Sequence, residues 1–142
     1  MANQIVNSNF LTNNRAVSAQ GLLNTASRLR LYKTAITPSP ADTLATYTGH
    51  ECDFDTYSIQ TLTGGWATPV KIIDGEYQTL SGVSTYSSPA TTGNTIYGAF
   101  VDDNAGNLLF AFEFDTAIAF TVGAPELQLQ IAYQVWAKSI VP

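Results

Sequence analysis

The sequence is poor in the residues that most often build metal and catalytic centres. Its 142 residues include one cysteine and one histidine, and only 12% of them are charged. A single cysteine cannot form an intramolecular disulfide, so nothing in the chain requires an oxidising compartment. A structural zinc site needs four ligands, usually in short Cys or His pairs, and the composition does not supply them. We therefore expect neither a metal nor a cofactor.

Basic residues and long apolar runs are also scarce. Six lysines and arginines stand against eleven acids, a formal net charge of −5, which argues against binding nucleic acid through a broad basic face. No run approaches 18 uninterrupted apolar residues, and the first residues do not resemble a signal peptide. We expect no membrane insertion, folding in the cytoplasm, and a single core at this length.

The chain does contain strand-like alternation and clear turn signals. Leucines at 29 and 31 alternate with larger polar residues, FDTYSIQTL at 54–62 alternates similarly, and residues 127–135 place apolar side chains on one face. The turns DG at 74–75 and DDNAG at 102–106 each join two apolar runs, which predicts two β-hairpins. The pattern predicts no helix within residues 29–142. We predict an all-β fold, either an antiparallel β-sandwich or a jelly-roll-like barrel.

The first 28 residues differ from the rest of the chain. They are rich in Asn, Ser and Ala, and they lack sustained alternation. We interpret residues 1–28 as an N-terminal arm, partly extended or forming a short helix, ahead of a sandwich domain at 29–142. The arm is basic and the domain is acidic, so the arm is suited to an acidic partner. The candidate partner-binding residues are Phe10, Arg15, Arg28 and Arg30 near the arm, with Trp66 and Tyr97 as possible interface aromatics.

The segment GHECDFD, residues 49–55, gathers the histidine, the cysteine and three acids. An alternating strand would place His50 and Cys52 on one face, which makes a nucleophile and base pair conceivable, but no third residue orients it at a recognisable spacing. The aspartates of this segment, or the run at 102–104, offer oxygen ligands for calcium without matching a known calcium loop. Such acids also favour ordinary turns. We favour a non-enzymatic protein and leave calcium open.

One set of motifs is distributed over two long stretches, LRLYKTAITPSPADTLATYTGHECDFDTYS and TGNTIYGAFVDDNAGNLLFAFEFDTAIAF. It comprises a short strand, a TPSP turn at 37–40, an acidic and aromatic stretch at 53–57, and an NTIYG strand at 94–98 before a glycine-containing turn. With these motifs, residues 29–136 resemble a group of small virion-associated structural proteins of tailed bacteriophages. The long segment at 1–27 departs from the shorter members.

The resemblance implies a capsid decoration or cement protein, made in the host cytoplasm and located in the virion. Its partner would be the major capsid protein or another virion subunit. It would be a homo-oligomer, with a trimer favoured by analogy with cement proteins at local threefold positions. A tail or baseplate role is compatible with the same resemblance. The alternative function is accordingly a tail or baseplate module that recognises host-surface glycans through tyrosine and tryptophan side chains.

Overall fold

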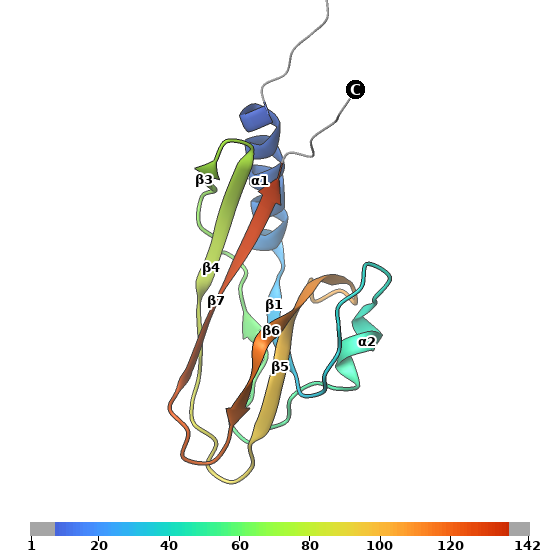
Figure 1. The fold of residues 1–142 in the computed structure, drawn as a ribbon, viewed down its shortest axis with the longest axis vertical. Coiled ribbons are helices and arrows are strands. Elements are labelled where there is room, and N and C mark those ends of the chain that lie inside the picture. Colours follow the sequence, from blue (N-terminus) through green and yellow to red (C-terminus); the bar gives the residue numbers. More distant parts are fainter. Residues whose placement is uncertain (1–7, 137–142) are drawn as a thin grey trace, which may run out of the picture.

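Two antiparallel sheets packed together make up most of the protein (Figure 1). The computed structural model describes residues 8–136, with side chains described for residues 13–135. One sheet has the strand order β2-β1-β5-β6 and the other β3-β4-β7, which confirms the predicted all-β sandwich. The elements are α1 (Ser8–Thr25), β1 (Arg28–Tyr32), α2 (Leu44–Thr48), β2 (Gln60–Thr61), β3 (Val70–Ile73), β4 (Glu76–Tyr86), β5 (Asn94–Asp102), β6 (Leu108–Phe120) and β7 (Leu127–Trp136).

Both predicted hairpins are present. The DG turn joins β3 to β4, where Ile73 pairs with Glu76 and Gly75 has a φ of 79°. The DDNAG turn joins β5 to β6, and its Asn104 and Gly106 have φ values of 58° and 92°. Positive φ is favourable for glycine and tolerated by asparagine, so the turn residues themselves position the strands.

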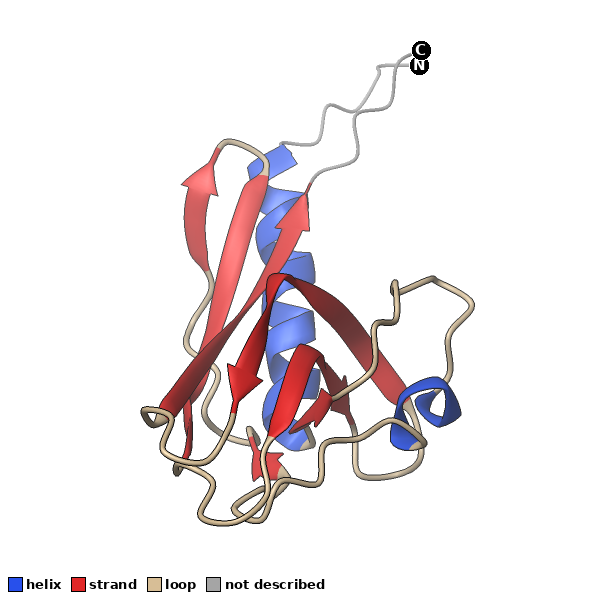
Figure 2. Ribbon diagram, turned by 60° about the horizontal axis from the view of Figure 1, so that its bottom comes forward, coloured by secondary structure: helices blue, strands red, loops and turns tan. Residues whose placement is uncertain are grey.

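Residues 8–25 form the helix α1, and this helix packs on the sandwich instead of extending away from it. Figure 2 shows α1 running alongside the strands. Ala16 is fully buried and Leu23 is 4% exposed, a spacing of seven residues that puts both on one helix face. The predicted boundary between arm and domain, after residue 28, lies within β1. The helix that precedes this boundary packs on the sandwich that follows it. Residues 1–7 of the expected arm lie outside the described residues.

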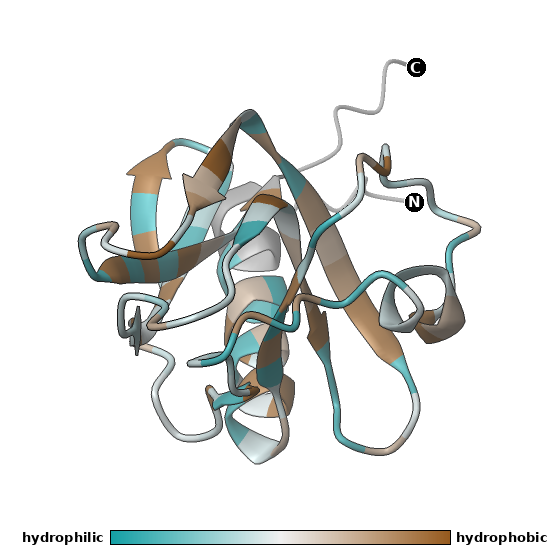
Figure 3. Cartoon of the chain, turned by 90° about the horizontal axis from the view of Figure 1, so that it is seen from below, coloured by the Kyte–Doolittle hydropathy of each residue, from teal (hydrophilic) through white to brown (hydrophobic). Residues whose placement is uncertain are grey.

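The main core lies between the two sheets and α1. Leu29 and Leu31 point into it from β1, as their alternation predicted, and both are fully buried. Figure 3 shows hydrophobic and hydrophilic residues alternating along some of the strands. The buried members of this core are Leu23, Leu29, Leu31, Cys52, Phe54, Leu62, Trp66, Tyr86, Ile96, Ala99, Val101, Phe120 and Ile131.

A second, smaller core lies on the opposite face of the four-stranded sheet, beneath α2. It contains the fully buried rings of Tyr32, Tyr47 and Phe100. The Tyr32 ring crosses the backbone at Gly98, where an added Cβ would overlap the Tyr32 side chain and the carbonyl oxygen of Phe112. The Tyr32 hydroxyl donates a hydrogen bond to that same oxygen at 3.0 Å. Glycine at this position is therefore required for the ring to lie against β5.

Two local predictions were wrong. Only Gln60–Thr61 of the alternating stretch at 54–62 forms a strand, because Phe54 turns into the core and residues 55–56 form a turn. The short helix α2 was not predicted, since five residues are too few to show a helical period. No helix in the described part of the chain is long and apolar enough to cross a membrane.

Candidate functional site

A cluster of charged side chains lies on the face of β1 that points away from the main core. Asp102 is fully buried and accepts hydrogen bonds from Arg28 at 2.9 and 2.7 Å and from Arg30 at 2.8 Å. Arg30 also donates to both carboxylate oxygens of Glu51, at 2.7 and 2.8 Å. The Tyr57 hydroxyl donates to Glu51 at 2.6 Å. Every carboxylate oxygen in the cluster is thus engaged, and the cluster joins β1, β5 and the segment around Glu51.

The hydrogen bonds within this charged cluster favour the charged forms of Asp102 and Arg30. Burial alone would raise the pKa of Asp102, but the hydrogen bonds from Arg28 and Arg30 outweigh burial and lower it. The hydrogen bond to Glu51 raises the pKa of Arg30 against the opposing effect of desolvation. Burial, followed by the contact with Glu51, raises the pKa of Tyr57 well above its ordinary value. The Asp102 carboxylate and the two guanidinium groups therefore stay charged at neutral pH, while Tyr57 stays neutral.

The segment GHECDFD does not bring its histidine and cysteine to one surface. Cys52 is 3% exposed, and burial raises the pKa of its thiol to about 12. His50 is exposed. The two side chains do not share a strand face, because the segment forms a single isolated bridge at Glu51 and then turns. A protonated, buried thiol is a poor nucleophile, so this pair does not form the conceivable dyad.

The remaining acids of this segment hold loops in place. Asp53 forms an ion pair with Lys33 at 2.7 Å and accepts a hydrogen bond from the Asn94 side chain at 3.0 Å. Asp55 accepts hydrogen bonds from the backbone N–H groups of residues 90 and 92 at 3.0 to 3.1 Å. Among the described residues, no group of three or more His, Cys, Asp and Glu side chains could hold a metal ion.

Three of the predicted partner-binding residues are used inside the protein. The side chains of Arg28 and Arg30 are 26% and 11% exposed and are held by the charged cluster. Trp66 is 3% exposed, and its indole N–H donates to the Ser27 hydroxyl at 3.0 Å. The acids and the hydroxyl that these three side chains bind come from distant parts of the same chain, so each of them has an internal role in addition to the predicted one.

The other three predicted residues have different environments. Arg15 is exposed on α1, where it stays accessible to a partner. Tyr97 is half-buried and packs at the margin of the second core. Phe10 belongs to α1, and its side chain lies outside the described part of the structure.

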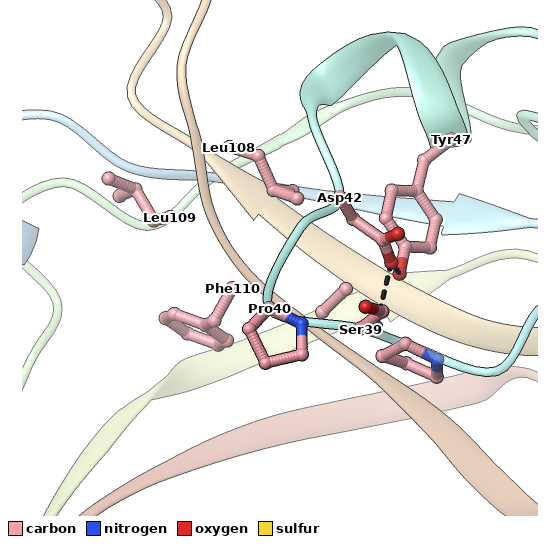
Figure 4. A pocket seen from close by; sticks show the side chains of 9 residues that line it. Ser39, Pro40, Asp42, Tyr47, Leu108, Leu109 and Phe110 are labelled. Atoms are coloured by element: carbon pink, nitrogen blue, oxygen red, sulfur yellow. Dashed lines mark hydrogen bonds between the residues drawn. The ribbon is translucent and has the colours of Figure 1, made fainter.

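A pocket of about 390 Å³ opens between the TPSP turn and the beginning of β6. Figure 4 shows the Tyr47 and Asp42 side chains converging on one side of it. Tyr47 donates a hydrogen bond to Asp42 at 2.7 Å, and the backbone N–H of Ser39 donates to the same oxygen at 2.9 Å. Leu108, Leu109, Phe110 and Ala111 line the pocket on the β6 side, with prolines 38 and 40 opposite. The pocket offers one carboxylate beside an apolar wall.

The outer side of the three-stranded sheet is uncharged along most of its length, with Glu76 at one end, and we call its uncharged part the glutamine face. Residues that lie opposite each other on β4 and β7 point to the same side of the sheet, and every second pair points to this outer side. Val83, near its middle, is 59% exposed. The alternation at 127–135 signals the β7 half, whereas the β4 half was missed because a bulge between Leu80 and Val83 interrupts its period. The members are Gln78, Leu80, Val83, Thr85, Gln128, Gln130, Ala132 and Gln134.

These surfaces and clusters are the structural basis for assigning a function. The charged cluster is internal, the pocket has one acidic side chain among its lining residues, and the glutamine face is open to solvent. Comparison with protein-family models, with curated proteins and with solved structures finds no match to this chain.

Proposed function

We propose that this chain is a non-enzymatic structural protein of a tailed-phage virion that decorates and reinforces the capsid. In this role it packs against the major capsid protein or another virion subunit. The observation that carries the proposal is the glutamine face, a solvent-exposed sheet surface whose members carry no charge and which has Glu76 only at its end. Covering such a surface costs less desolvation free energy than covering a charged one, because its amides can form hydrogen bonds to the partner and none of its members is an ion.

Its side chains suit a stable subunit contact. The Val83 side chain is 59% exposed, and Val70, which pairs with Gln78, is 62% exposed, so covering them removes apolar area from water. Glutamine amides both donate and accept hydrogen bonds, and Gln134 already pairs with Gln78 at 2.9 Å. The virion assignment itself is supported by the resemblance of residues 29–136 to phage structural proteins.

Two valine substitutions test the surface assignment. Val83→Lys places a charge in the glutamine face and should reduce attachment of the purified protein to capsids that lack it. Val122→Lys is the matched control, since Val122 is 55% exposed and lies in the turn between β6 and β7. Equal attachment of the two variants would contradict the use of this face.

The copy number per particle tests the location. A decoration protein is expected in a number comparable to that of the major capsid protein, because it follows the symmetry of the shell. A small number set by the symmetry of the tail would instead place the protein in the tail or baseplate. Quantitative mass spectrometry of purified virions measures this number directly.

The pocket beside Asp42 supports the alternative of a glycan-binding module in the tail. A carboxylate can accept hydrogen bonds from sugar hydroxyls, and an apolar wall can cover the face of a sugar ring. The Tyr and Trp side chains first considered for this role contribute less, because Trp66 is buried in the core. Specific signals on a glycan array, lost in Asp42→Asn, would favour this alternative over decoration.

A further inference from the structure

The outer edge of β7 is the best candidate for a contact between copies of this chain. In the three-stranded sheet β7 pairs with β4 on one side, and no described strand pairs with its other side. The strand is ten residues long, LQLQIAYQVW, and contains no charge, proline or glycine. A long open edge of this kind presents a row of backbone donors and acceptors that a further strand can use.

The other open edges of the two sheets carry the features that usually prevent such pairing. Strand β6 has exposed Glu113 and Asp115, and its register with β5 shifts strongly in the same region. Strand β3 has four residues, including Lys71, and β2 has only two. Short strands, irregular register and charged edges all oppose edge-to-edge association. Among the described strands, β7 alone combines length with an unprotected edge.

We propose that two copies of this chain pair through antiparallel contact of their β7 strands, forming a continuous sheet with three strands from each copy. An identical partner fits because β7 is uncharged, so self-pairing brings no like charges together. On the glutamine face, glutamines of one copy lie beside glutamines or Ala132 of the other. Contact between identical strands is two-fold by symmetry, so it forms a dimer and not the trimer expected by analogy.

An apolar groove on the inner side of the same strand adds to this contact. The groove has a volume of about 140 Å³ and lies between α1, the beginning of β6 and the Tyr133 side chain. Leu22 and Leu109 line it while being 73% and 41% exposed. In an antiparallel pair centred on residue 131 or 132, an apolar inner-face residue of the second copy lies opposite Tyr133. Pairing therefore covers exposed leucine surface together with the open edge.

The test uses the purified full-length chain and the variant Ala132→Lys. Ala132 is exposed and near the centre of β7, so the two introduced lysines lie directly opposite or diagonal to each other in the dimer. Sedimentation velocity over a range of concentrations should give the wild type a mass of twice 15.3 kDa. The Ala132→Lys variant should dimerise at least about tenfold more weakly. A mixture of Ala132→Lys with Ala132→Glu should regain dimerisation.

The control is Val83→Lys, which adds the same charge to the same face on the central strand β4. It should keep the wild-type dimer, and circular dichroism should confirm that all variants are folded. A wild type that stays monomeric at every concentration, or an Ala132→Lys variant that dimerises as tightly as Val83→Lys, overturns the proposal. The biological meaning of the dimer rests on the proposed assembly function. A monomer could still decorate capsids, so a negative result for dimerisation would not contradict capsid attachment, and a negative result for attachment would not contradict dimerisation.

Discussion

Replacing Asp102 with asparagine removes the charge at the centre of the charged cluster while keeping the size of the side chain. Asp102 is fully buried and binds two guanidinium groups, which would then lose their shared counter-ion. Removing one partner of a buried ion pair typically costs about 3 to 5 kcal/mol. Arg30 keeps Glu51 and Arg28 is partly exposed to water, so we expect the lower end, about 3 kcal/mol.

Urea unfolding followed by circular dichroism measures this loss. With a typical slope of about 1 to 3 kcal/mol per molar urea, the unfolding midpoint should fall by about 1 to 3 M. The matched control is Asp53→Asn, which removes the acid of the exposed Lys33–Asp53 pair. Its midpoint should move far less, because water replaces the lost contact. A loss below about 1 kcal/mol for Asp102→Asn would refute the argument that the buried cluster stabilises the sandwich.

The dependence of stability on pH provides a second readout of the same substitution. The pKa of Asp102 is lowered in the folded protein, so its contribution is complete above the unfolded value of about 3.9 and is lost as pH falls through the folded pKa. The wild type should therefore lose its advantage over Asp102→Asn below about pH 4. A difference between the two proteins that stays constant from neutral pH to pH 2 would contradict this linkage.

Three further substitutions or reactions test the packing. Cys52 should react with a thiol reagent at least about a hundredfold more slowly in native protein than in urea, because it is buried and its pKa is raised to about 12. Leu23→Ala should cost about 2 to 4 kcal/mol of unfolding free energy, whereas the neighbouring Leu22→Ala, 73% exposed, should cost little, as measured by urea unfolding. Gly98→Ala should destabilise by about 1 to 3 kcal/mol because its methyl group overlaps the ring that crosses it, whereas Gly82→Ala has room for a methyl group, and thermal unfolding compares the two.

Each of these has an outcome that would contradict the structure. Rapid labelling of Cys52 in the native state would mean that its surroundings open readily. Equal losses for the two leucine variants would mean that α1 does not pack on the sheet through Leu23. A Gly98→Ala variant as stable as Gly82→Ala would mean that Tyr32 does not cross β5 at this position.

The fold class and most strand positions follow from the sequence alone. The hairpins at DG and DDNAG form where predicted, because a turn with positive φ and its two flanking strands are encoded within a few residues. The alternation at 127–135 likewise distinguished the more buried face of β7, with Ile131 at its centre, from the more exposed one. Local patterns of this kind need no information from distant parts of the chain.

The partners of the polar side chains were decided only by the tertiary structure. Arg28 and Arg30 suggested a free basic arm, but pairing of β1 with β5 brings Asp102 opposite Arg28 across more than 70 residues. Trp66 suggested an exposed aromatic, but its indole N–H donates to Ser27, and its backbone N–H donates to Asn24 of α1. The open edge of β7 is also a tertiary property, because only the order of strands in a sheet determines which backbone groups lack a neighbour. Sequence periodicity reports burial along one element, whereas charge pairing and strand order depend on which elements the folded chain brings together.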